Sequence, residues 1–290
     1  METVESVRIL KRPKLRSPYM VAAWPGMGGV AIIAANYLRQ QLKAEEIGEI
    51  DPYHFFSPAQ VLIQDYLIQA PEFPESKFYS WGEDRDHGLL IFTGSSQPER
   101  GYEFAQRVLD VAEEFQVARI YTFAAFPMFI HHSRRPRVWG TVTNAELVEY
   151  LEEFGVRLME QGSIGGLNGL LLGVAKERGM GGICLLGEIP VYATQVANPK
   201  AAQAVLEVLL EMLDIGIDLN ELSIWSERIE PDMNKLYSAL PENMREAIDR
   251  AESLAAPPKS TETEMDRSLF QEIEDFLEEQ RKKGKGNQFD

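Results

Sequence analysis

Apolar and polar positions follow one another along the chain as short apolar runs separated by amphipathic stretches. Four apolar runs, six to ten residues long, have the length and flanking turn residues typical of buried strands; they are residues 19–24, 87–94, 118–127 and 181–188. Between them, apolar residues recur every three or four positions, which predicts helices. Buried strands that alternate with helices form a largely parallel sheet with both faces covered. The pattern therefore predicts an α/β fold, a three-layer α/β/α sandwich.

Three of the connecting helices carry recognisable boundary residues. One is predicted to start near Met27, after a glycine-rich turn, and its alanines allow it to approach the sheet closely. Pro98 is placed at the first turn of a second helix, which runs to Phe115. A third helix starts near Gly166 and ends at Gly179, as a glycine at the helix end predicts.

The end of the chain has a different pattern, with helical periodicity and no further apolar strand. A polar stretch with two prolines then interrupts it and predicts a linker. We therefore predict an α/β/α core domain at 1–222, a helical extension packed on the core at 223–254, a linker at 255–267, and an amphipathic helix with a tail at 268–290. The last helix carries an apolar stripe that requires a partner surface, formed by Leu269, Phe270, Ile273, Phe276 and Leu277.

Charge and cysteine content narrow the classes of function. The 290 residues include 29 basic and 45 acidic side chains, a net charge of −16, which disfavours binding to nucleic acid or to an anionic membrane surface. The single cysteine, Cys184, excludes an intramolecular disulfide and a cysteine-based zinc site. The N-terminus carries charges where a signal peptide needs an apolar core, and we interpret no later stretch as a membrane span. The sequence predicts a cytoplasmic protein.

The stretch "WPGMGG" follows the first predicted strand, where ligands bind in parallel sheets. Gly26, Gly28 and Gly29 would let a phosphate approach the backbone, with Met27 between them. The loop lacks the Lys-Ser/Thr ending of a Walker loop, and it matches the dinucleotide fingerprint only as a variant with Ala31 at the last position. Two interpretations stay open, a nucleotide site and a structural or partner-contact turn, and the low specificity of the motif favours the turn.

A second strand-to-helix turn, "FTGSSQP", contains Gly94, Ser95 and Ser96. Either serine can cap the following helix through its hydroxyl oxygen. The turn lacks the closing glycine of a nucleophile elbow, which disfavours a serine hydrolase, and we predict no catalytic residue. If the chain binds a cofactor or substrate, the crevice at the strand ends is the predicted place; its candidate residues are Gly26, Met27, Gly28, Gly29, Gly94, Ser95, Ser96, Asn168 and Glu188.

One basic cluster, "HHSRRPR", stands out in this acidic chain. His131 and His132 are adjacent, so their side chains cannot both face one ion from a strand, and no acidic residue nearby completes a metal site. We predict no metal. We interpret the cluster as an exposed loop that meets an acidic surface on another subunit.

Several of these stretches together resemble a known family. "WPGMGGVAIIAANYL", "FTGSSQP" and "GLNGLLLGVAKERGMGGICLLGEIPVYATQVANPKAAQAVLEVLLEML" occur in the order found in the family named for the second proteasome assembly chaperone, over roughly residues 7–222. The resemblance implies a phosphorylase-like three-layer sandwich, assembly-chaperone activity, homo-oligomers and no cofactor. Some members are labelled ATP-grasp carboxylate-amine ligases, but this sequence lacks paired acidic metal ligands with a nucleotide-facing lysine.

The resemblance also directs attention to the end of the chain. Relatives that bind proteasomes can end in a hydrophobic-Tyr-X tail, and here the end is Gln288-Phe289-Asp290, with the aromatic at Phe289 kept and a polar residue before it. Two functions follow. The first is a non-catalytic, homo-oligomeric protein that binds a proteasome or another protein complex. The second is an enzyme that holds a nucleoside, a nucleotide or the substrate of an ATP-dependent ligase in the crevice.

Overall fold

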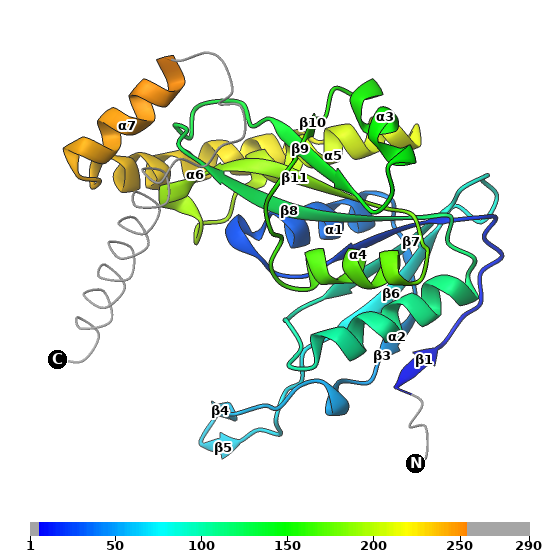
Figure 1. The fold of residues 1–290 in the computed structure, drawn as a ribbon. Helices are drawn as coiled ribbons and strands as arrows, with labels where there is room; N and C mark the ends of the chain where they lie inside the picture. Colours follow the sequence, from blue (N-terminus) through cyan, green and yellow to red (C-terminus); the bar gives the residue numbers. More distant parts are fainter. Residues whose placement is uncertain (1–5, 254–290) are drawn as a thin grey trace.

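The computed structural model describes residues 6–253, and within them the chain forms one large mixed sheet between two layers of helices (Figure 1). The sheet has nine strands in the order β1-β3-β6-β7-β2-β8-β11-β9-β10. Their bounds are β1 (Val7–Ile9), β2 (Tyr19–Ala23), β3 (Glu45–Ile50), β6 (Ser76–Trp81), β7 (Leu89–Gly94), β8 (Arg119–Met128), β9 (Val138–Val142), β10 (Arg157–Leu158) and β11 (Gly182–Pro190). The predicted α/β/α sandwich is confirmed.

The four predicted strands are β2, β7, β8 and β11, and they lie side by side and parallel in the order β7-β2-β8-β11. Every residue of β7 and β11 is buried, because helices cover both faces of this central part. The outer strands β1, β3, β6 and β9 pair antiparallel with their inner neighbours. The sequence pattern did not predict them, because they are short and mix polar with apolar residues.

The helices pack as two layers around two apolar cores. On one face lie α1 (Val30–Gln41), α3 (Glu146–Glu153) and α5 (Pro199–Leu213), and on the other lie α2 (Gly101–Glu114) and α4 (Leu167–Glu177). A short 3₁₀ turn, η1 (Met27–Gly29), precedes α1. Gly179 adopts the left-handed conformation, with φ at 72°, just after α4, as predicted for a helix end. Pro98 lies three residues before α2, not within its first turn.

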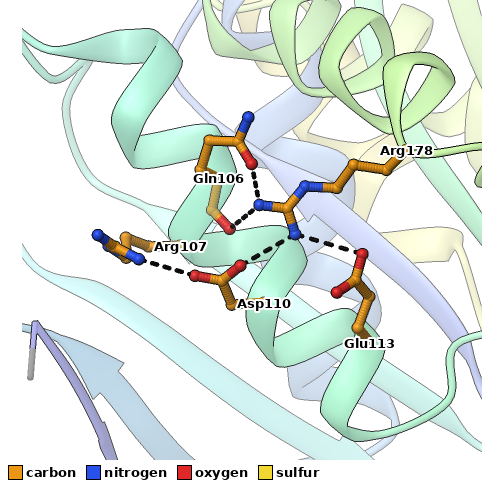
Figure 2. A network of polar contacts seen from close by, with 5 residues as sticks. All are labelled: Gln106, Arg107, Asp110, Glu113 and Arg178. Atoms are coloured by element: carbon orange, nitrogen blue, oxygen red, sulfur yellow. Dashed lines mark hydrogen bonds and ion pairs between the residues drawn. The ribbon is translucent and has the colours of Figure 1, made fainter.

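An ionic cluster joins α2 and α4 at the surface (Figure 2). Arg178, which ends α4, donates to the Asp110 carboxylate at 2.9 Å and contacts Glu113 at 3.3 Å. It also donates to the backbone oxygen of Gln106 at 3.2 Å and to the side-chain oxygen of the same residue. The guanidinium thus contacts three residues on successive turns of α2, which fixes the relative position of the two helices.

The last described helices, α6 (Asn220–Ser238) and α7 (Glu242–Ser253), extend beyond the layers (Figure 1). They pack on a third, smaller apolar core, together with the turn η3 (Val191–Ala193) that follows β11. Among the described residues, no helix is long and apolar enough to cross a membrane. The domain boundaries stay predictions, and the proposed linker at 255–267 and helix at 268–290 lie outside the described residues.

A two-stranded hairpin, β4 (Ile63–Gln64) and β5 (Leu67–Ile68), forms a separate small sheet. It lies between β3 and β6, after the 3₁₀ turn η2 (Pro52–His54). Figure 1 shows it projecting from the body of the molecule, away from both helix layers.

We predict opposite effects of one substitution at two glycines. A methyl group at Gly94 would stand 2.5 Å from the ring of the fully buried Trp24, so Gly94→Ala should lower the free energy of unfolding by about 1–3 kcal/mol. At Gly173 in α4 no heavy atom of the described chain lies within 4 Å of the new methyl, so Gly173→Ala should raise it by about 0.5–1 kcal/mol. Urea unfolding measures both, and a Gly94→Ala protein as stable as the wild type would contradict the packing.

Candidate functional site at the carboxyl edge of the sheet

The loop of residues 24–29 turns the chain from β2 into α1 at the carboxyl edge of the central strands. Gly28 and Gly29 both adopt the left-handed conformation, with φ values of 61° and 60°, which explains why the turn needs glycine at these positions. Gly28 is buried, and a side chain there would meet Asn198 and Ile189. Met27 is instead exposed at the surface.

Three backbone N–H groups of this loop, those of Trp24, Gly28 and Gly29, have partners within the protein. The N–H of Gly28 donates to the oxygen of Thr194 at 2.7 Å, and the N–H of Gly29 donates to the oxygen of Gly26 at 3.0 Å. The oxygen of Gly28 accepts from the N–H of Asn198 at 2.7 Å. A phosphate site requires such N–H groups to point toward a ligand. Here the two bonds of Gly28 join the loop to the segment after β11, as expected for a structural turn.

Two amide side chains connect the loop to α4 and to the turn after β7. The Asn168 oxygen accepts from the N–H of Trp24 at 2.9 Å, and its nitrogen donates to the oxygen of the same residue at 3.0 Å. Gln97 donates to the oxygen of Pro25 at 2.8 Å and accepts from the N–H of Leu167 at 2.9 Å. Asn168 is only 4% exposed, and its amide provides partners for the buried backbone N–H and oxygen of Trp24 at the end of the strand.

The serines of the second turn do not cap α2. The Ser95 hydroxyl accepts from the N–H of Glu75 at 2.9 Å, and the N–H of Ser95 donates to the oxygen of Glu75 at 2.8 Å. Ser95 therefore fixes the residue that precedes β6. Arg100 is the N-cap residue of α2, and its side chain makes no capping hydrogen bond. Gly94 lies against Trp24, and Ser96 is half-buried.

Glu188 and its neighbour Ile189 on β11 point to opposite faces of the sheet. Of the two, Ile189 is the residue that a side chain at Gly28 would meet. The Glu188 carboxylate accepts from the indole N–H of Trp139 at 2.9 Å and from the N–H of Arg137 at 3.2 Å. Burial raises the pKa of this carboxyl, against the lowering effect of the Trp139 hydrogen bond. The structure thus brings Gly26, Gly94 and Asn168 together around Trp24, whereas the Glu188 carboxylate is bonded to Trp139 and Arg137.

A small charged cavity lies beside Glu188, under α6. His132, Arg134, Lys200 and Glu230 are among its lining residues, and its volume is about 30 Å³. One water molecule needs about 10–15 Å³ by this measure, whereas pockets for small-molecule ligands measure about 300–1,000 Å³. The cavity therefore has room for one or two waters and not for a nucleoside.

The sequence predicted that the basic cluster forms an exposed loop. This is wrong for His132, which is buried next to the cavity. His132 is buried, and its Nδ1 lies 2.8 Å from the Tyr192 hydroxyl. The Lys200 ammonium donates to the backbone oxygen of His132 at 2.8 Å. Arg135 is exposed, but it pairs with Glu207 of the same chain at 2.9 Å. Within the described residues, no group of three or more His, Cys, Asp and Glu side chains is placed to hold a metal ion.

Four other residues that close this edge were not predicted from the sequence; they are Tyr192, Thr194, Asn198 and Lys200. Each acts through a bond between segments distant in the sequence, which leaves no local pattern to detect. The cofactor-binding set stays a prediction, and the predicted partner-binding residues from Leu269 onward lie outside the described residues.

Known proteins resemble most of this chain in sequence or in fold. Residues 20–237 match the sequence profile of the PAC2 family. The uncharacterized protein MJ1210 of Methanocaldococcus jannaschii is 30% identical over 226 residues, 77% of this chain and 84% of that protein. Pyrococcus furiosus PbaB, an archaeal proteasome activator, is 32% identical with a TM-score of 0.69, over 79% of this chain and 97% of that one. Pyrococcus furiosus PbaA, an archaeal homologue of proteasome-assembly chaperone, is 25% identical with a TM-score of 0.62, over 85% and 99%.

We predict that Asn168 stabilises the fold. Asn168→Ala leaves the buried N–H and oxygen of Trp24 without partners, which should lower the free energy of unfolding by about 2–4 kcal/mol. Asn36→Ala, at a partly exposed position of α1, is the matched control and should change it by less than about 0.5 kcal/mol. Chemical denaturation compares the two variants, and equal stabilities would show that the Trp24 bonds contribute nothing.

A second prediction concerns acid. Burial lowers the pKa of His132, and the neighbouring His131 lowers it further. The unfolded chain then binds more protons than the folded one below about pH 6.5, so stability should fall as the pH drops through that value. His132→Gln should flatten the melting temperature between pH 7.5 and 5.5, whereas His54→Gln, at an exposed histidine, is the control. An unchanged slope in His132→Gln would contradict the assignment.

Proposed function

Because the chain belongs to the PAC2 family, we propose that it is a non-catalytic, assembly-chaperone-like protein that forms homo-oligomers and binds a larger protein complex of the proteasome type. The observation that carries the proposal is the 32% identity to an archaeal proteasome activator over 79% of this chain. The likeness to an archaeal homologue of proteasome-assembly chaperone supports the same class of function. Both matches span nearly the whole length of the relative, so they involve the complete fold.

The geometry of the carboxyl edge supports a role without chemistry. The N–H groups of Gly28 and Gly29 bond to Thr194 and Gly26, and the Asn168 amide bonds to both backbone groups of Trp24. Glu188, the buried acid of this region, is held by Trp139 and Arg137. No group of this set is directed at a space of substrate size, since the charged cavity measures only about 30 Å³.

The alternative, an enzyme acting on a nucleoside or nucleotide, receives no comparable support. The N–H groups of Gly28 and Gly29 in the predicted loop bond to other groups of this chain. Some members of the family are labelled ATP-grasp ligases, but the described residues contain no group of three or more His, Cys, Asp and Glu side chains placed to hold a metal ion. A nucleotide would first have to break the bonds between Gly28, Thr194 and Asn198.

The proposal is tested by capture of purified proteasome core particles on the immobilised full-length protein. We expect binding by the full chain, its loss on truncation after Pro258, and a marked loss in Phe289→Ala, since the tail supplies the aromatic anchor in this proposal. Gln288→Ala is the matched control and should bind as the wild type does.

Two outcomes of this experiment would count against parts of the proposal. Equal binding by the truncated and full chains would place the contact on the core and overturn the role of the tail. Absence of binding by every variant, together with a rise in melting temperature on addition of ATP or a nucleoside, would favour the enzyme instead.

A further inference from the structure

The β4–β5 hairpin is the most exposed apolar feature of the described chain. We call residues 57–71, which include it, the arm. Ile63 pairs with Ile68 and Gln64 with Leu67, and the N–H of Gln69 donates to the oxygen of Leu62 at 2.9 Å. All residues from 57 to 68 are exposed. The apolar ones on the arm are Val61, Leu62, Ile63, Tyr66, Leu67 and Ile68.

The arm has few charges for an exposed segment of this protein. The chain carries a net charge of −16, yet the arm contains a single charged residue, Asp65. Ile63 and Ile68 are 73% and 74% exposed, and Tyr66 at the tip is fully exposed. A two-stranded hairpin is marginally stable alone in water, and open strand edges with apolar side chains promote association. The arm therefore has the properties of a surface that another chain covers.

The turn of the hairpin is built at a conformational cost. Asp65 and Tyr66 both adopt the left-handed conformation, with φ values of 50° and 67°. Two-residue hairpin turns of this kind favour asparagine and glycine, and a bulky residue pays about 1–2 kcal/mol there. The strained position holds an aromatic ring at the outermost point of the arm. Strain of this kind is found where a function requires the geometry.

We propose that the arm is the contact between two copies of this chain, hairpin against hairpin across a two-fold axis. This inference rests on the homo-oligomer in the proposed function and specifies where its subunits meet. Two copies with a net charge of −16 repel each other when their bodies approach. An arm with a single charge that projects from the body (Figure 1) allows contact at a distance from that repulsion.

The edges and the area of the arm also fit a second copy. In the described part of the chain, β4 and β5 pair only with each other, so each has an open edge. Identical antiparallel strands related by a two-fold axis can pair along such edges and satisfy the same groups in both copies. If about two thirds of the area exposed by the six apolar residues of the arm were covered in each copy, the total would reach about 1,000 Å², the minimum for a specific interface.

A single-cysteine experiment on the full-length protein tests the contact. Cys184 is fully buried, so a cysteine introduced at the surface is the reactive one. Ile63→Cys and Tyr66→Cys should each give a covalent dimer with a short bifunctional maleimide at micromolar concentration, because a symmetric contact brings each residue near its own copy. Ile224→Cys, at a similarly apolar exposed position on α6, is the matched control and should stay uncrosslinked. Crosslinking of the control alone would overturn the proposal.

A charge-introducing variant gives an independent readout. Ile63→Glu with Ile68→Glu places like charges across the contact and should raise the dissociation constant of the oligomer at least tenfold in sedimentation equilibrium. Ile224→Glu should leave it unchanged. Melting temperatures near that of the wild type would show that both variants are folded. An oligomer that survives the double substitution, or a wild type that is monomeric, overturns the arm contact, whereas the separate proteasome-capture experiment decides the proposed function.

Discussion

The paired hydrogen bonds between the Asn168 amide and the backbone of Trp24 are the interaction on which the carboxyl edge of the sheet depends. They join the end of β2 to the first turn of α4, two elements 144 residues apart in the sequence. Trp24 can then stay fully buried against Phe92 and Phe104 and fill the space that Gly94 leaves free. Gln97 extends the same kind of bond to Pro25 and Leu167.

This closed edge has a consequence for function. In parallel sheets the carboxyl edge is the usual place for ligands, because loops and helix starts offer unpaired N–H groups there. Here the N–H groups of Gly28 and Gly29 bond to Thr194 and Gly26, and that of Trp24 bonds to Asn168. Exposed apolar residues lie elsewhere on the surface, and the arm is the most prominent group of them. The balance favours a protein that works by contact with other proteins, in agreement with its likeness to an archaeal proteasome activator.

The sequence predicts the central strands of this fold well. It predicts the outer strands and the hydrogen bonds at the carboxyl edge poorly. The four buried strands and the end of α4 at Gly179 follow from local apolar pattern and glycine placement. Strands β3 and β9 escape the same analysis because their residues mix polar with apolar side chains. Ser95 was expected to cap a helix but bonds to Glu75, and buried His132 was expected in an exposed loop, because both depend on distant partners. The arm was not predicted from the sequence, because its low charge does not distinguish it from stretches such as residues 19–38, which carry no charge and are mostly buried.

Hydrogen exchange at the amides of Trp24, Gly28 and Gly29 tests the central claim most directly, because exchange reports whether each N–H is bonded in the free protein. The account predicts strong protection of these amides in the free protein and no change on addition of millimolar ATP or nucleoside. Rapid exchange in the free protein that slows when a nucleotide is added would contradict it, since the loop would then be open and built to hold a phosphate.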